Sequence, residues 1–402
     1  MIRVLHTSDW HIGHQFHNRK RDDEFAAFLN WILNTVKERR IDALIVAGDV
    51  FDSSAPPNSA VRLYYEFLRE LQATPCRAAV ITGGNHDSPS FLNAPRELLR
   101  SAFPIYIFGS ASPEPEEEVI ALRSESGEPE LVIGAVPYLR DADLVSLVFG
   151  ENLADHEKKV IAGLRNHYRR VAEKAEELRA GRDIPVILTG HFFLTGGRTV
   201  PNDGMREYIG GIGAFDAALL PETPDYYALG HIHQPQKIGA DHIRYSGSPL
   251  KMCFSDAAPR TVCEIEFTGR TPHIAELPVP QFSDIRRLCG NWEELEPRLE
   301  AVAASEKEIL CEVTANDLSG AELVSRTDAL FQKRMKNYPL ILRSAKTEVH
   351  AVKAITPEQV AEMTESQIFE LRLKRENLPD ADANALRDLY RQAVLAVKEE
   401  NA

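Results

Sequence analysis

Seven side chains of the kinds that bind metal ions occur in short motifs within the first 233 residues of the chain. They are Asp9, His11, Asp49, Asn85, His191, His231 and His233. Carboxylate, imidazole and amide ligands without thiolates suit Mn²⁺, Fe²⁺ or Zn²⁺ in a catalytic site. Seven ligands are too many for a single catalytic ion that keeps an open position. They suit two ions about 3.5–4 Å apart that share a carboxylate and a bridging water, an arrangement that supports in-line displacement at phosphorus.

One further histidine, His86, directly follows the candidate ligand Asn85 and is not needed as a ligand itself. It is therefore the best candidate for a general acid that protonates a leaving alkoxide. His231 and His233 have i, i+2 spacing, as do the two ligands of the first motif, and in an extended segment such side chains point the same way. The remaining histidines are interpreted as ordinary hydrogen-bonded core or surface residues: His6, His14, His17, His156, His167, His242, His273 and His350.

Each motif follows a short run of apolar and β-branched residues, the pattern of a buried strand. The runs lie at residues 3–8, 43–47, 78–82, 185–189 and 226–229. Apolar residues at helical spacing in 23–39, and a helix opened by Pro56-Pro57, connect the first three strands as βαβ units. Because ligands collect beyond the carboxyl ends of strands in open α/β sheets, we expect all five motifs to converge on one place.

The rest of the chain predicts smaller parts around this site. An acidic, proline-containing segment, Glu114 to Glu118, is interpreted as an exposed hairpin or loop, and an amphipathic helix is expected at 156–180. After a linker at 278–280 the pattern is βαβαβ, with strands near 282–288, 309–314 and 340–344 and helices near 292–304 and 320–336. Two charged helices follow Thr356. Their apolar stripes suit folding back on the same domain or docking on a partner, and the pattern leaves both open.

The bulk properties are those of a multidomain protein of ordinary globular composition. A length of 402 residues favours two or three domains. The five scattered cysteines are interpreted as reduced thiols of a cytoplasmic protein, and no signal peptide or membrane span is expected. The net charge of −14 argues against broad attraction to nucleic acid. Two local stretches are basic. Residues 17–21 suit a functional basic surface and a solvated loop equally well. Residues 165–170 are better interpreted as a solvated helix face.

Written in full, the five motifs resemble those of the calcineurin-like metallophosphoesterases. They read Asp9-x-His11, Gly48-Asp49-x-x-Asp52, Gly84-Asn85-His86-Asp87, Gly190-His191 and Gly230-His231-x-His233. The resemblance covers about residues 1–270. It implies a four-layer α/β/β/α sandwich with two metal ions at the strand ends.

Further features resemble the SbcD family, the nuclease subunits of bacterial SbcCD complexes, through the full length of the chain. They are residues 8–13, the Asn18-Arg19 loop, residues 48–52, Gly247-Ser248-Pro249, the small βαβαβ domain and the charged helical tail. The resemblance implies one ion held by Asp9, His11, Asp49 and His233, and another held by Asp49, Asn85, His191 and His231. It also implies that His86 assists proton transfer.

The same resemblance implies an activity and a set of partners. The activity is Mn²⁺-dependent 3′→5′ exonuclease on double-stranded DNA and endonuclease on single strands and hairpins, in DNA recombination, repair and replication, with Fe²⁺, Zn²⁺ or Mg²⁺ as substitutes. The partners are a second copy of the chain and the SMC-like ATPase SbcC, together forming a heterotetramer. The implied domains are a nuclease domain (1–278), a capping domain that helps present DNA (281–350) and an ATPase-binding tail (356–402). The expected location is the cytoplasm, at the nucleoid.

Some residues depart from related patterns and keep alternatives in view. Archaeal and eukaryotic relatives carry a histidine where this chain has Asp52, so no role of that histidine is transferred. Phosphoprotein phosphatases carry arginine after this aspartate, whereas Ser53 follows it here. A cyclic-nucleotide phosphodiesterase would leave residues 281–402 without a purpose. A non-catalytic adaptor would be favoured by a lost ligand, and no ligand is lost.

Overall fold

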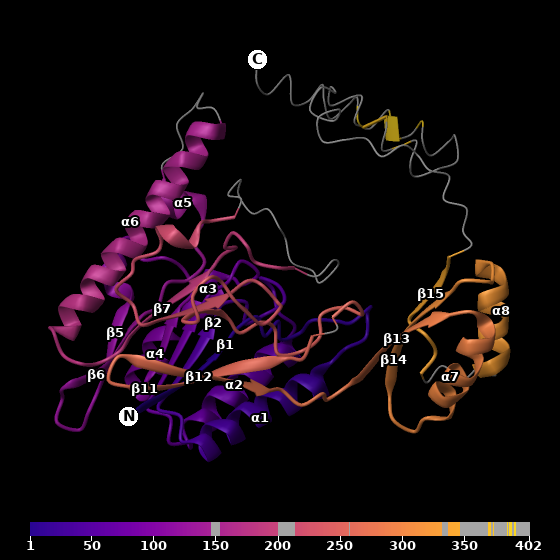
Figure 1. Ribbon diagram of the computed structural model, residues 1–402, viewed down its shortest axis with the longest axis horizontal. Helices are drawn as coiled ribbons and strands as arrows, with labels where there is room; N and C mark the ends of the chain where they lie inside the picture. Colours follow the sequence, from indigo (N-terminus) through magenta and orange to yellow (C-terminus); the bar gives the residue numbers. More distant parts are fainter. Residues whose placement is uncertain are drawn as a thin grey trace. The chain divides into compact units, whose positions relative to one another are not determined.

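The computed structural model describes residues 1–145, 153–199, 214–256, 258–331 and 337–345, together with scattered residues of the C-terminal stretch. The chain divides into two compact units, Met1–Ala345 and Lys346–Ala402. Figure 1 shows the elements in chain order. Within the described residues, no helix combines the length and the apolar character needed to cross a bilayer.

The strands that precede the first three motifs lie side by side in a six-stranded sheet of order β12-β11-β1-β2-β3-β4. Strands β1 to β4 are parallel, and β11 and β12 are antiparallel additions beside β1. Helices α1 and α2 cover the outer face, where Phe28 and Ile32 of α1 join Leu44 and Val46 of β2 in one core. The bounds are β1 Ile2–Thr7, α1 Asp22–Arg39, β2 Ala43–Ala47, α2 Asn58–Leu71, β3 Ala78–Thr82, β4 Ile105–Phe108, β11 Thr261–Thr268 and β12 Thr271–Pro278.

The strands that precede the last two motifs lie in a second six-stranded sheet of order β5-β6-β7-β8-β10-β9. Strands β6, β7, β8 and β10 are parallel, and β5 and β9 form antiparallel edges. Helix α6 covers the outer face with Leu164, Tyr168 and Val171. The bounds are β5 Val119–Arg123, β6 Pro129–Gly134, α6 Leu153–Arg179, β7 Val186–His191, β8 Tyr226–Gly230, β9 Gln236–Lys237 and β10 Ile243–Tyr245.

The inner faces of the two sheets share one apolar core. Val4 and Ile45 of the first sheet and Ile133 and Ala228 of the second belong to this core, and none of them is exposed. The layers therefore run helix, sheet, sheet, helix. The four-layer α/β/β/α sandwich expected from the sequence is confirmed.

The acidic segment at 114–118 differs from the expected exposed hairpin or loop. Pro115–Glu118 form a 3₁₀ turn, η1, and Glu118 is fully buried. The cause is the facing side of α6, where His167 Nε2 lies 2.8 Å from Glu118 Oε2 and Arg170 pairs with Glu116. These contacts also use much of the basic stretch at 165–170, so those side chains serve packing of α6 rather than an open basic patch.

A third, three-stranded parallel sheet of order β13-β14-β15 has the expected βαβαβ order. Helices α7 and α8 lie on one face of it, around a core that includes Leu295 and Val313. The bounds are β13 Asp284–Gly290, α7 Trp292–Ala304, β14 Ile309–Ala315, α8 Gly320–Phe331 and β15 Ile341–Ser344. The shorter helices of the chain are α3 Pro89–Asn93, α4 Arg96–Ala102, α5 Asp141–Leu144 and η2 Ala217–Leu219.

The C-terminal unit contains the helical tail predicted after Thr356, most of which lies outside the described residues. Three contacts are described. The rings of Phe369 and Tyr390 stack with centroids 4.1 Å apart. Arg387 Nε lies 2.8 Å from Glu370 Oε1, and Arg387 Nη1 donates to Asn384 Oδ1 at 2.9 Å. The two predicted apolar stripes therefore meet each other. The three-domain division and the docking role of the tail stay predictions.

Candidate metal centre

The seven candidate ligands come together at the carboxyl ends of strands from both large sheets. In chain order, Asp9 and His11 follow β1, Asp49 follows β2, Asn85 follows β3, His191 ends β7, and His231 and His233 follow β8. Every motif is thus placed by a buried strand that ends at the same edge of the sandwich. The convergence expected from the strand pattern is present in the structure.

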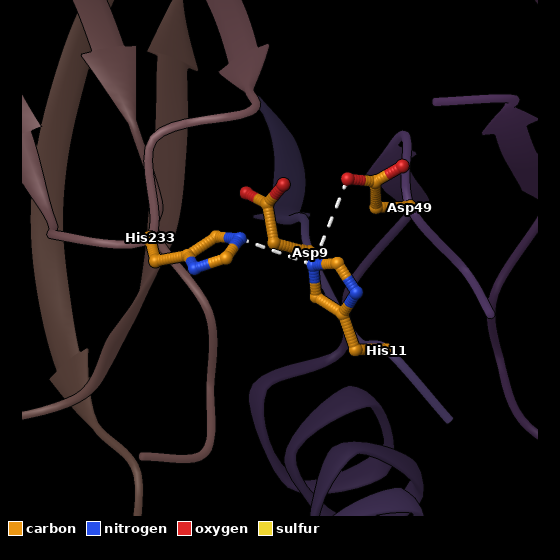
Figure 2. A group of neighbouring side chains, drawn as sticks. All are labelled: Asp9, His11, Asp49 and His233. Carbon is orange, nitrogen blue, oxygen red and sulfur yellow. Dashed lines mark hydrogen bonds and ion pairs between the residues drawn. The ribbon is translucent and has the colours of Figure 1, made fainter. Parts of the chain in front are cut away.

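Figure 2 shows the first group, Asp9, His11, Asp49 and His233, whose potential ligand atoms all lie within 4.8 Å of one another. The Nε2 atoms of His11 and His233 are 3.1 Å apart, and His11 Nε2 lies 3.6 Å from Asp49 Oδ2. All four side chains are buried. The group therefore surrounds one small volume with two carboxylates and two imidazoles.

Asp49 also contacts the second group, which consists of Asn85, His191 and His231. Asp49 Oδ2 lies 3.2 Å from His191 Nε2. Asn85 Oδ1 lies 3.1 Å from His191 Nε2 and 3.0 Å from His231 Nδ1. The carboxylate of Asp49 is thus between the two groups, which is the position required of a shared ligand.

The backbone at four of these residues is left-handed. Asp9, His11, Asp49 and His231 have φ angles of 51°, 47°, 49° and 97°. Residues with a side chain seldom adopt positive φ, and each such residue costs about 1–3 kcal/mol when the surroundings enforce it. The turns allow each side chain to point back into the site immediately after its strand. Strain of this kind is characteristic of functional sites.

Two motif glycines leave room that any side chain would fill. Gly48 has a φ of +84°, and a Cβ placed there would lie 2.1 Å from His191 Nδ1. A Cβ at Gly84 would lie 2.1 Å from Asp49 Oδ1. The glycines therefore permit the close approach of two candidate ligands to the backbone of neighbouring motifs.

Burial and mutual charge set the protonation of the site. Burial lowers the pKa of His231 to about 3 and that of His233 well below its ordinary value. Burial also opposes charge on Asp49 and His191, but their mutual attraction outweighs it, lowering the pKa of Asp49 and raising that of His191 to about 9. Neutral His231 and His233 beside an ionised Asp49 are forms that bind a metal ion, whereas His191 would release its proton when a cation takes the place of that proton beside Asp49.

The donor set fits divalent cations on chemical grounds. Imidazole nitrogens that face each other at 3.1 Å cannot both direct lone pairs at one another, and Asn85 Oδ1 is approached by two imidazoles. A cation beside each pair would satisfy these lone pairs and the buried carboxylates. Oxygen and imidazole ligands suit Mn²⁺, Fe²⁺ or Zn²⁺.

Comparison with known proteins finds a matching family and several similar chains. The calcineurin-like phosphoesterase family matches residues 2–235, more than half of the chain. A solved structure of a dimetal phosphatase from Danio rerio is 10% identical, covers 70% of this chain and 97% of that one, and has a TM-score of 0.41. The SbcD component of the nuclease SbcCD from Bacillus subtilis (strain 168) is 35% identical over 64% of this chain and 63% of that one. The SbcD component of the nuclease SbcCD from Escherichia coli (strain K12) is 32% identical over 97% of each chain.

The chain belongs to the SbcD family of calcineurin-like phosphoesterases. Membership makes it a metal-dependent phosphodiester hydrolase, with divalent cations as cofactors. The assignment of individual ligands, and of His86 as the proton donor, rests on position in the motifs and stays a prediction.

In this SbcD-family chain, His86 lies against the candidate ligands while its side chain stays half-buried. Its Nδ1 lies 2.9 Å from the carbonyl oxygen of Asp52, so Nδ1–H is the donor and Nε2 is left for other partners. Its backbone N–H donates to Asp49 Oδ1 at 2.9 Å, and its ring packs edge-on against His11 with centroids 4.9 Å apart. This is the placement that a proton donor to a leaving group requires.

Asp52, the last residue of the second motif, lies close to a candidate ligand. Its Oδ1 lies 3.5 Å from His11 Nδ1, on the opposite side of the ring from the Nε2 that faces His233. A carboxylate near Nδ1 favours the tautomer in which Nε2 is the lone-pair donor to a metal.

Asp87 is a residue whose role the motif reading missed. Its buried carboxylate accepts backbone N–H groups of Val50 at 3.0 Å, Phe51 at 2.9 Å and Gly84 at 2.9 Å. Asp87 thus joins the turn that carries Asp49 to the turn that carries Asn85. The signal in the sequence was an acidic residue directly after the asparagine and histidine of its motif.

The basic stretch at 17–21 divides into two parts in the structure. Arg21 is buried, pairs with Glu24 at 2.6 Å and donates to the carbonyl oxygen of Lys251 at 2.8 Å. Arg19 and Lys20 are exposed, and the His17 ring stacks on Phe254 with centroids 5.2 Å apart. Arg21 therefore serves packing, and the open question of a functional basic surface concerns the two exposed residues.

Proposed function

We propose that the chain is the nuclease subunit of an SbcCD-type DNA repair complex and hydrolyses DNA phosphodiesters with two divalent cations, preferably Mn²⁺. The observation that carries the proposal is the position of Asp49 between the two ligand groups. The backbone N–H of His86 donates to the same carboxylate. Fe²⁺, Zn²⁺ and Mg²⁺ are the alternative cations.

The residues divide into two subsites and one proton donor. Asp9, His11, Asp49 and His233 form the first subsite, and Asp49, Asn85, His191 and His231 form the second. When bound, two cations lower the pKa of a bridging water and neutralise charge on a phosphate. His86, held by the Asp52 carbonyl at Nδ1, presents Nε2 to the leaving oxygen and protonates it.

The proposed substrates and partners follow from the likeness to the SbcD component of the nuclease SbcCD, which extends over 97% of the chain. The activities are 3′→5′ exonuclease on double-stranded DNA and endonuclease on single strands and hairpins, in recombination, repair and replication. Residues 281–350 present DNA to the nuclease domain at 1–278. Residues 356–402 dock on an SbcC-type ATPase, and two copies of each chain form a heterotetramer in the cytoplasm.

The test uses the purified full-length chain on end-labelled linear duplex DNA with Mn²⁺, Mg²⁺ or EDTA. We expect Mn²⁺-dependent degradation from 3′ ends that is lost in His86→Ala and Asn85→Ala. His273→Ala is the matched control, because His273 is an exposed histidine on β12 and should leave activity unchanged.

Other outcomes have distinct meanings. Hydrolysis of phosphomonoesters without DNA cleavage would favour a phosphatase. A chain that stays inactive on DNA even with added SbcC-type ATPase and ATP would favour a non-catalytic adaptor.

A further inference from the structure

Residues between Ser246 and Arg260, after the last metal motif, contact the backbone and side chains that carry the ligands of the first subsite. This segment lies beyond residues 2–235, the part that matches the phosphoesterase family. Ser246 Oγ is 2.8 Å from Ser8 Oγ, and Ser8 Oγ donates to Asp9 Oδ2 at 2.5 Å. Both serines are fully buried. One end of this segment therefore supports the carboxylate of Asp9 through a hydroxyl chain.

The other end of the segment supports His233. Arg260, only 6% exposed, donates from Nη1 to the carbonyl oxygen of His233 at 2.6 Å. The backbone N–H of Ser248 donates to the same oxygen at 3.0 Å. Asp256, 1% exposed, forms an ion pair with Arg260 Nη2, and its Oδ2 accepts the N–H of Met252 at 2.9 Å.

These contacts hold the backbone from which the imidazole of His233 extends. A carbonyl oxygen that accepts from two donors is held in place, so the position of the His233 Cα–Cβ bond is restrained, and the side chain starts from a fixed point on its way to the 3.1 Å approach of Nε2 to His11. A guanidinium is planar and always charged, and a buried carboxylate holds it in one orientation. The N–H of Val279 also donates to the carbonyl oxygen of Arg260 at 2.8 Å, so the backbone of Arg260 is held as well.

The second subsite has a different support. His191 Nδ1 lies 3.0 Å from the carbonyl oxygen of Ala47, within the first sheet, and the turn of Asn85 is held by Asp87. The contacts of Ser246 and Arg260 with the site instead lead to Asp9 and His233. The backbone N–H of His231 donates to Asp9 Oδ1 at 2.8 Å, so the two subsites touch through this bond. The direct contacts of the segment are with Asp9 and His233 of the first subsite, so changes in the segment should act more strongly on that subsite.

We propose that Arg260, oriented by Asp256, is a positioning residue that sets the metal affinity of the subsite formed by Asp9, His11, Asp49 and His233. The inference rests on the proposed two-ion function and deepens it. Residues behind metal ligands typically change metal affinity by roughly 10–100-fold when replaced. Replacing Arg260 should therefore weaken only one of the two Mn²⁺-binding events.

The test is calorimetric titration of the metal-free, full-length chain with Mn²⁺, which needs no activity measurement. We expect two binding events in the wild-type chain, and in Arg260→Met one event weakened by at least about ten-fold. Arg260→Lys, which keeps a charge and a donor, should recover part of the loss. The matched control is Arg179→Met, because Arg179 is similarly buried and pairs with Asp225 at 3.0 Å, before β8 and away from its carboxyl end.

The control removes the same charge and a similar buried ion pair, so Arg179→Met should lower the melting temperature and bind Mn²⁺ with wild-type affinity. If Arg260→Met does not fold, Asp256→Asn, which leaves the Arg260 side chain in place, should weaken the same event. Wild-type affinity at both subsites in the folded Arg260 or Asp256 variant overturns this inference alone. A wild-type chain that binds fewer than two Mn²⁺ overturns the two-ion proposal and this inference with it.

Discussion

Replacement of Asp87 by asparagine should destabilise the fold. The carboxylate is 3% exposed and accepts three backbone N–H groups, two on Oδ2 and one on Oδ1. In Asp87→Asn the amide oxygen can keep the bonds from Val50 and Gly84. The amide nitrogen then faces the N–H of Phe51, donor against donor.

The size of the effect follows from this count. A buried donor left without a partner costs about 1–3 kcal/mol, and a bond to a charged acceptor is at the upper end of the hydrogen-bond range. Burial and the nearby charge of Asp49 raise the pKa of Asp87 to about 6, so the ionised carboxylate itself costs stability at neutral pH and a neutral amide recovers part of that cost. We therefore expect Asp87→Asn to lower the free energy of unfolding by about 1–2 kcal/mol. Asp87→Ala leaves three such donors, a loss of roughly 3–9 kcal/mol, which is comparable to the whole stability of a typical domain. Asparagine is thus the informative replacement.

The assay is urea and thermal unfolding of the metal-free full-length chain, followed by circular dichroism. For a unit of 345 residues, a loss of about 1–2 kcal/mol corresponds to a decrease in melting temperature of roughly 1.5–3 °C. The control is Asp241→Asn, since Asp241 is 72% exposed in a surface pair with Lys237, and surface pairs contribute little. A melting temperature of Asp87→Asn within about 1 °C of wild type would refute the account of Asp87 as the bond between two turns.

Three further results are expected. Gly48→Ala should weaken Mn²⁺ binding by at least about ten-fold, because the added Cβ would displace His191. The control is Gly239→Ala, which is also at positive φ but faces open space and should keep wild-type affinity. Equal affinities of the two variants in calorimetry would contradict this. Burial lowers the pKa of His6 to about 3, so between pH 6.5 and 3 the unfolded chain binds a proton that the folded chain does not. His6 should therefore reduce the free energy of unfolding by up to about 1.4 kcal/mol per pH unit as the pH falls through this range. Urea titrations at pH 7, 6 and 5 test this, and His6→Gln should show a shallower decrease; parallel curves would refute it. EDTA should lower the melting temperature, and excess Mn²⁺ should raise it again in proportion to the logarithm of the Mn²⁺ concentration. A melting temperature that responds to neither would contradict a metal site in the folded state.

The sequence predicted the parts of the site that depend on local order. Strands followed at once by Asp9, Asp49 or His191 could be recognised one at a time, because a buried strand and the turn after it are adjacent in the chain. The rule that parallel strands share a carboxyl edge then brought the motifs together. The βαβαβ order of the small sheet was predictable for the same reason, whereas the four-layer fold was expected from the resemblance of the motifs to a known family.

What the sequence did not predict depends on contacts between distant residues. Glu118 is buried only because His167, 49 positions later, faces it from α6. Ser8 meets Ser246 across 238 positions. Arg260 looked like any charged residue of a loop, and nothing near it in the chain indicates that its partner is the carbonyl oxygen of His233. A backbone acceptor leaves no trace in residue type, so contacts of this kind are visible only in the structure.

The pairing of β1 with β11 has a consequence for the order in which the site is made. β1 leaves the ribosome before the other strands of its sheet, yet one of its two neighbours, β11, spans Thr261–Thr268. A chain still being synthesised therefore carries Asp9 and His11 long before His231, His233 and Arg260 exist. On the proposed assignment of ligands, the metal centre is completed only after most of the chain has been built, so the topology itself delays the reactivity of the site.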